Sequence, residues 1–86
     1  MAFVKSQLSN EAMATIALLF RSLGEVVRLK IIRLVENKEM TVGDIAKSLK
    51  TSQANVSKHL RLLINAGVLS RRAQGTAAYY QSLIHI

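Results

Sequence analysis

The segment Thr51-Ser-Gln-Ala-Asn-Val-Ser-Lys-His-Leu-Arg-Leu-Leu-Ile-Asn-Ala-Gly67 predicts a capped, two-sided helix around which the rest of the chain can be arranged. Ser52 can accept a hydrogen bond from a backbone N–H of the first turn, and Gly67 can adopt the left-handed conformation that closes a helix. At about 100° per residue, apolar side chains fall on one face and small, amide or basic ones on the other: Val56, Leu60, Leu63 and Ile64, opposite Ala54, Ser57, Lys58, Arg61 and Asn65. Such a helix can pack on a core and enter a nucleic-acid groove, but an ordinary surface helix would have the same pattern.

Length and composition indicate one folded domain. The chain has 86 residues, half of them hydrophobic, which favours a globule over disorder. It has no cysteine, which excludes disulfides, thiolate metal sites and thiol redox chemistry. The longest nearly apolar run, Ala12 to Phe20, is too short to span a bilayer, and Asn10-Glu11 before it argues against a signal peptide. We therefore expect a cytoplasmic protein with no membrane partner.

The charge is unevenly distributed. The net charge is +7, but all five acidic residues and six of the twelve basic residues lie in residues 1–44, which therefore carry only +1. Residues 45–86 hold the other six basic residues and no acid, so they carry +6. An acid-free basic half predicts a polyanionic partner, the alternative being a basic surface that is merely solvated. A membrane-surface helix would want aromatic anchors, and this half has only Tyr79 and Tyr80.

The N-terminal part predicts a flexible arm and a dimerisation helix. We expect residues 1–8 to be the arm and residues 9–22 the helix, with Ser9 or Asn10 at its N-cap. The helix is apolar on more than one side, so it needs two partners, and in so short a chain one of them is expected to be a second copy. The alternative is that the other helices bury it entirely. The expected dimer-interface residues are Met13, Ile16, Ala17, Leu19 and Phe20.

The middle of the chain predicts two further helices. Leu23-Gly24-Glu25 interrupts the pattern and is expected to begin a second helix over residues 25–37. Thr41-Val-Gly-Asp44 resembles a capping box that begins a third helix, followed closely by the helix described first. Residues 41–67 therefore predict a helix-turn-helix unit. The expected core positions of the second and third helices are Val27, Ile31, Leu34, Val35, Ile45, Ala46 and Leu49.

After Gly67 the hydrophobic period changes to that of a β-hairpin. Residues 68–72 and 76–82 are expected to form two strands around Ala73-Gln-Gly75, within a wing spanning residues 68–83. A basic hairpin directly after a helix-turn-helix is typical of a winged helix. The fold class that we predict for residues 1–86 is therefore mainly α with a small β-hairpin, a winged helix-turn-helix in one domain.

Residues 19–80 resemble the ArsR/SmtB family of bacterial transcriptional repressors. The collinear matching segments are Leu19-Phe-Arg-Ser-Leu-Gly24, Arg28-Leu-Lys-Ile-Ile32, Met40-Thr-Val-Gly-Asp-Ile-Ala46, Ser52-Gln-Ala-Asn-Val-Ser-Lys-His-Leu60, Ala66-Gly-Val-Leu69 and Arg71-Arg72 with Gly75 and Tyr79-Tyr80. The resemblance implies a winged-helix homodimer that binds a palindromic operator and releases it when an effector binds.

The sequence also departs from this family. The two cysteines of the thiolate metal sensors correspond to Thr41 and Gly43, neither of which is a soft metal ligand. Glu25-Val26 replaces the usual Asp-Pro, and Thr76 stands where the wing often has a basic residue. The family usually has a C-terminal helix that completes the dimer and can carry a second metal site, and this sequence ends where that helix would begin. His85 falls near the start of that site as a single imidazole. We therefore expect no metal and no cofactor.

His59 is the one histidine in the predicted recognition helix, and no arrangement of catalytic residues surrounds it in the sequence. His59 lies between the two faces of its helix, where we expect a half-buried ring that hydrogen-bonds locally or to a phosphate; a metal ligand or a pH switch is the alternative. Ser57 and His59 do not form a triad, because residues two apart on a helix do not face each other. The sequence has neither a catalytic cysteine nor a phosphate-cradling glycine loop, so we expect no enzyme.

These observations predict a sequence-specific DNA-binding transcriptional regulator, a homodimeric repressor that binds a pseudo-palindromic operator on double-stranded DNA, with an unknown effector. The alternative is a winged-helix module that binds a protein, which would expose apolar residues on its wing where this chain has Arg71-Arg72. Four residues are expected at base edges: Gln53, Ala54, Ser57 and Lys58. The other expected DNA contacts mostly hold phosphates: Thr51, Ser52, Asn55, His59, Arg61, Arg71, Arg72, Gln74 and Thr76.

Overall fold

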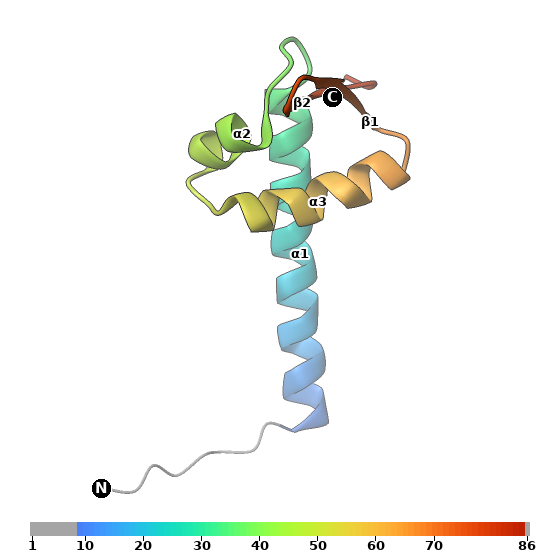
Figure 1. Ribbon diagram of the computed structural model, residues 1–86. Coiled ribbons are helices and arrows are strands. Elements are labelled where there is room, and N and C mark those ends of the chain that lie inside the picture. The colour runs from blue at the N-terminus through green and yellow to red at the C-terminus, as the bar shows by residue number, and fades with distance from the viewer. Residues whose placement is uncertain (1–8, 86) are drawn as a thin grey trace, which may run out of the picture.

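The computed structural model describes residues 9–85 and has a mainly helical architecture with one β-hairpin (Figure 1). The elements in chain order are α1 (Asn10–Leu34), α2 (Val42–Leu49), α3 (Gln53–Asn65), β1 (Leu69–Gln74) and β2 (Ala77–Ser82). The α3 helix crosses α1, and the hairpin follows it as a wing (Figure 1). This arrangement confirms the predicted winged helix-turn-helix. The predicted arm 1–8 and Ile86 lie outside the described residues.

The expected helix break at Gly24 is wrong, because α1 is continuous for 25 residues. Ser9 is its N-cap, and the Ser9 hydroxyl accepts from the Ala12 N–H at 3.1 Å. A glycine inside a helix costs only about 1 kcal/mol relative to alanine, which packing of the following turns can outweigh. Residues 25–34 of the predicted second helix are therefore the C-terminal half of α1, and residues 35–37, which were also expected to be helical, lie beyond its end. Despite this length, no helix within residues 9–85 is apolar enough to cross a membrane.

Local caps set the two helices of the helix-turn-helix unit as predicted. The Thr41 hydroxyl accepts from the Asp44 N–H at 3.2 Å and begins α2, and the Ser52 hydroxyl accepts from the Asn55 N–H at 3.1 Å and begins α3. Lys50 ends α2 in the left-handed region, with φ of 55°, and Gly67 follows α3 with φ of 79°. The tight turn between α2 and α3 therefore follows from side chains that the sequence places at the helix ends.

The core lies between the C-terminal half of α1 and the elements that follow it. The buried apolar residues come from or next to α1, α2, α3 and β1: Ile31, Ile32, Val35, Ile45, Ala46, Val56, Leu60, Leu63 and Leu69. Ile31 and Val35 are fully buried, while Val27 and Leu34 pack against the core from its edge. The N-terminal half of α1 extends away from this core (Figure 1), so its side chains remain largely exposed.

The wing is a two-stranded antiparallel sheet joined to the segment before α2. Its register runs from Leu69 opposite Ser82 to Gln74 opposite Ala77. The turn is therefore the two residues Gly75-Thr76, whereas the three residues 73–75 were expected, because the first strand continues through Gln74. Gly75 has φ of 60°, a conformation that glycine adopts without steric penalty. On the edge of β2 that does not pair with β1, Met40 and Tyr80 exchange two backbone hydrogen bonds, of 3.1 and 2.9 Å. The wing is thus held to the connection between α1 and α2.

Candidate nucleic-acid interface

The exposed face of α3 presents the residues expected at base edges. Gln53, Ala54, Ser57 and Lys58 are all solvent-exposed, whereas Val56, Leu60 and Leu63 on the opposite face are buried. Ala54, Ser57 and Lys58 share a shallow depression with Arg61 and Leu62. The helix contains no acidic residue. The structure therefore gathers amide, hydroxyl and ammonium groups on one face that can meet a polyanion.

The first turn of α3 is organised by its own polar side chains. Ser52 uses its hydroxyl to cap the helix, and the Asn55 side-chain amide donates to the Thr51 hydroxyl at 3.1 Å. Thr51 and Asn55 are half-buried, whereas Ser52 and Gln53 are exposed. These contacts fix the orientation of the exposed helix end, where Gln53 is located.

His59 lies away from the exposed face and packs between α3 and α1. Its side chain is 6% exposed, and its Nδ1 lies 3.4 Å from Nη1 of Arg28. Burial is the main cause that lowers the pKa of His59, with the positive charges of Arg28 and Lys58 adding to it. The neutral ring can accept from the Arg28 guanidinium. The expectation of a local hydrogen bond matches this geometry, and we do not retain His59 among the proposed DNA contacts.

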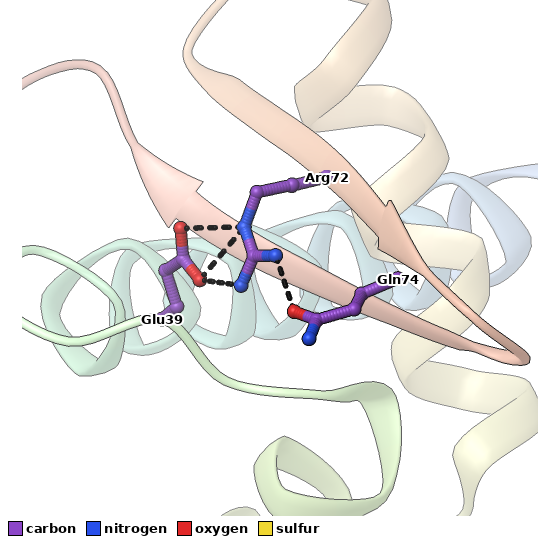
Figure 2. Close-up of polar contacts among 3 residues, drawn as sticks. All are labelled: Glu39, Arg72 and Gln74. Carbon is purple, nitrogen blue, oxygen red and sulfur yellow. Dashed lines mark hydrogen bonds and ion pairs between the residues drawn. The ribbon is translucent and has the colours of Figure 1, made fainter.

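The two wing arginines point to opposite faces of the hairpin, as successive strand residues do. Arg71 lines a shallow hollow shared with α3, whose members include Ser57, Arg61 and Asn65. Arg72 instead contacts Glu39 and Gln74 (Figure 2). Gln74 and Thr76 are exposed near the tip of the wing. The structure thus separates Arg71 and Arg72, which were expected from the sequence to serve the same purpose.

The guanidinium of Arg72 is held by three side chains. Its Nη2 lies 2.6 Å from Oε2 of Glu39, and its Nε lies 3.2 Å from both carboxylate oxygens. Its Nη1 donates to the Gln74 side-chain oxygen at 2.6 Å, and its Cζ stands 4.9 Å from the centre of the Tyr79 ring. The hydrogen bond from Arg72 lowers the pKa of Glu39 and raises that of Arg72. Sequence reasoning missed this contact, because Glu39 and Arg72 are 33 positions apart and no local pattern links them.

A second surface is formed by the N-terminal half of α1. The exposed fractions of Met13, Leu19 and Phe20 are 50%, 59% and 69%; Ala17 is also exposed and Ile16 is half-buried. Further exposed apolar residues of α1 were not among those expected at the interface: Leu18, Leu23, Val26 and Leu29. The alternative that other helices of the same chain bury this segment does not hold for residues 9–85.

The described part of the chain offers no cluster of metal ligands. Within residues 9–85, no three His, Cys, Asp or Glu side chains are grouped so that they could hold an ion. Thr41, at one position that corresponds to a cysteine in thiolate sensors, caps α2 instead. His85 is exposed at the end of the described chain.

Comparison with known proteins identifies relatives of this architecture. Residues 25–71 match the family model described as bacterial regulatory protein, arsR family. The chain is 36% identical over 61 residues to the transcriptional repressor SdpR of Bacillus subtilis (strain 168), covering 71% of this chain and 68% of that protein. It is 39% identical over 69 residues to the arsenical resistance operon repressor of Escherichia coli (strain K12), covering 79% and 59%. The chain therefore corresponds to only part of each relative's length.

Solved structures show the same fold. The transcriptional regulator HlyU of Vibrio vulnificus CMCP6 superposes with a TM-score of 0.66 at 28% identity, covering 84% of this chain and 75% of that one. A homodimeric winged helix-turn-helix DNA-binding domain from Mycobacterium bovis, a possible ArsR-family regulator, gives a TM-score of 0.65 at 26% identity. That match covers 91% of this chain and 75% of the other.

Proposed function

The chain belongs to the arsR family of bacterial regulatory proteins, and we propose that it represses transcription by binding an operator as a homodimer. The observation that carries this proposal is the exposed, acid-free face of α3, which lies beside Arg71 of the wing. Relatives that share this family are named as repressors, which supports the direction of regulation. Because its target would be chromosomal DNA, we place the protein in the cytoplasm.

The proposed docking puts α3 in the major groove of the operator. In helix-turn-helix proteins the N-terminal part of the second helix contacts base edges, and here that part exposes Gln53, Ala54, Ser57 and Lys58. Gln53 can pair with adenine, Lys58 with guanine, and the Ala54 methyl group with that of thymine. Arg61 and Arg71 are suited to phosphates.

The remaining proposed contacts flank this docking. Thr51, Ser52 and Asn55 hold the first turn of α3, and we propose that they also approach the backbone there. Gln74 and Thr76 lie near the tip of the wing, where they would meet the neighbouring phosphates. These groups fix the register of the protein on the duplex and carry little sequence information.

The proposed dimer uses the N-terminal half of α1. A two-fold symmetric dimer presents the same surface twice, so the apolar face of one α1 would pack on that of the other. The homodimeric state of the Mycobacterium bovis domain supports this assembly. Two α3 helices so joined would contact half-sites about one helical turn apart, ~34–36 Å. The operator is accordingly proposed to be pseudo-palindromic.

A module that binds only protein is less well supported. Such a module would expose apolar residues along the wing, whereas the exposed residues around the turn of this hairpin include Arg71, Gln74 and Thr76, and the large apolar residue Leu83 is exposed only where the wing ends. The basic charge of residues 45–86 also fits a nucleic acid better than a typical protein surface.

The test is a binding selection from a random double-stranded DNA library with the purified protein. We expect enrichment of a pseudo-palindrome with half-sites one helical turn apart. Lys58→Ala should then lower operator affinity by about 1–3 kcal/mol and relax the preference at one base pair per half-site. Lys38→Ala is the matched control, because it removes the same charge from the exposed connection before α2. Failure to enrich any sequence would refute the proposal.

A further inference from the structure

The contact between Arg72 and Glu39 assigns the two wing arginines different roles. We propose that Glu39 and Arg72 form a tether that sets the position of the wing relative to α3. Arg72 is then a positioning residue, and Arg71 is the wing arginine that contacts a DNA phosphate. This inference rests on the proposed function, since it concerns how the same interface binds its operator.

The donor groups of Arg72 are largely engaged within the protein. A guanidinium has five N–H donors. The Nε and Nη2 groups donate to the carboxylate of Glu39, and Nη1 donates to Gln74. The ring of Tyr79 covers one face of the guanidinium (4.9 Å to its centre). Three of the five N–H groups are thus engaged, and a phosphate approaching Arg72 would meet a charge already neutralised by a carboxylate that is bound through both oxygens.

The tether joins β1 of the wing to the segment just before the helix-turn-helix unit. Glu39 lies two residues before Thr41, the N-cap of α2, and Met40 between them is hydrogen-bonded to Tyr80 of β2. Arg72 lies on β1, the strand beyond β2, so its side chain reaches across β2 to Glu39 (Figure 2). The wing is therefore fixed both by backbone bonds at β2 and by side chains at β1.

Arg71 has the opposite environment. It shares a hollow with Ser57 and Arg61, on the side of the hairpin that faces α3. None of the residues 9–85 forms an ion pair with it, and it is exposed. A phosphate held between Arg71 and Arg61 would meet two unneutralised cations, whereas one at Arg72 would meet a paired charge.

The tether should affect the position of the wing more than the stability of the fold. The side chains of Arg72 and Glu39 are 51% and 33% exposed, and exposed ion pairs contribute little to stability. Its variants should consequently unfold at nearly the wild-type temperature while binding the operator less well. A loss of affinity without a loss of stability distinguishes positioning from a merely structural role.

The first arm of the test measures the salt dependence of DNA binding for Arg71→Gln and Arg72→Gln. Arg71→Gln should reduce the slope of log K against log salt by about 0.9 for each phosphate that the variant no longer neutralises, on operator and random DNA alike. Arg72→Gln should lower operator affinity several-fold and leave the slope on random DNA unchanged. A slope reduced as much by Arg72→Gln as by Arg71→Gln would overturn the proposal.

The second arm exchanges the two charges. Glu39→Arg and Arg72→Glu should each weaken operator binding, and the double variant, whose net charge equals that of the wild type, should recover most of the wild-type affinity. A double variant that binds no better than Arg72→Glu alone would show that pairing is not what matters. Amide hydrogen exchange in β1, measured without DNA, should rise in both single variants and return toward wild type in the double. Unchanged exchange in the single variants would equally contradict the tether.

Wild-type binding separates this inference from the function on which it rests. If the wild-type protein prefers no DNA sequence, the proposed function fails, and hydrogen exchange alone decides whether the tether exists. If the wild type binds its operator and the charge exchange restores nothing, the tether fails while the proposed function stands.

Discussion

The exposed apolar residues of α1 allow the change in the dimer dissociation constant to be predicted for a single substitution. Phe20 is 69% exposed and Leu19 is 59% exposed, although both are large apolar side chains in the half of α1 that extends away from the core. Phe20 also borders a hollow shared with Asn55 and Lys58 of α3, so DNA binding by its variant is compared only after the oligomeric state has been measured. Replacing Phe20 with Glu removes the apolar surface available for the dimer and places a charge in its seam. The helix itself should persist, because residue 20 lies in its interior and glutamate is a good helix former.

The magnitude follows from the exposed fraction. Full burial of such a side chain contributes about 1.5–3 kcal/mol. Since 69% of Phe20 remains to be buried, dimerisation would gain about 1–2 kcal/mol per copy. A symmetric interface contains the residue twice, so the loss is about 2–4 kcal/mol per dimer. At 1.4 kcal/mol per tenfold change, the dimer dissociation constant should rise about 30- to 700-fold before the cost of burying the new charge is added.

The assay is sedimentation equilibrium over a range of protein concentrations, with circular dichroism to verify the helix content. We expect Phe20→Glu and Leu19→Glu to give folded monomers that bind the full operator weakly and without cooperativity. Ala14→Glu is the matched control: residue 14 is exposed on the same half of α1, on the side shared with Arg21 and Glu25, and should remain dimeric. If both variants dimerise like the wild type, the reasoning about α1 is refuted.

Three further predictions concern stability and ligands. Because the pKa of His59 is lowered in the folded protein, the unfolded chain binds more protons than the folded chain as the pH falls below the ordinary value of 6.5. The free energy of unfolding that depends on the neutral His59 is therefore present above that pH and is lost below it. The urea midpoint should therefore fall between about pH 7.5 and about pH 5.5, and fall less in His59→Gln; equal losses would contradict this. Gly24→Ala should raise the free energy of unfolding by about 0.5–1 kcal/mol, because the added Cβ would meet only the movable end of Arg28 at 3.2 Å and His59 at 3.5 Å; a lowered thermal midpoint would show that the contact cannot relax. Operator binding should be indifferent to arsenite, cadmium and thiol oxidants, since the chain has no sulfur ligand of the thiolate kind; release of the operator by any of them in a gel-shift titration would disprove this.

Much of the fold could be predicted because it depends on short-range chemistry. Ser9, Thr41 and Ser52 cap their helices within one turn, and periodic apolar residues mark the core faces of α1, α2 and α3. The error at Gly24 shows where this reasoning fails. A local weakness predicts a helix end only when tertiary contacts do not outweigh it, and here the following turns of α1 pack on the core.

The candidate site was less accessible to sequence reasoning. The exposed positions of Gln53, Ser57 and Lys58 follow from helical periodicity, which the burial along α3 confirms. The different environments of Arg71 and Arg72 do not, because they depend on Glu39, a residue brought near by folding. The strand alternation of the wing could have separated the two arginines, but it could not show which face meets α3.

We propose that the exposed face of α3 selects the operator sequence, and Gln53→Ala removes one base contact from this face without changing its charge. The measurement is a comparison of the base preferences selected from random DNA by the wild type and by Gln53→Ala. We predict that one base pair in each half-site loses its preference, that operator affinity falls by about 1–3 kcal/mol, and that affinity for random DNA is unchanged. Identical base preferences at every position for the two proteins would contradict the proposed docking of α3.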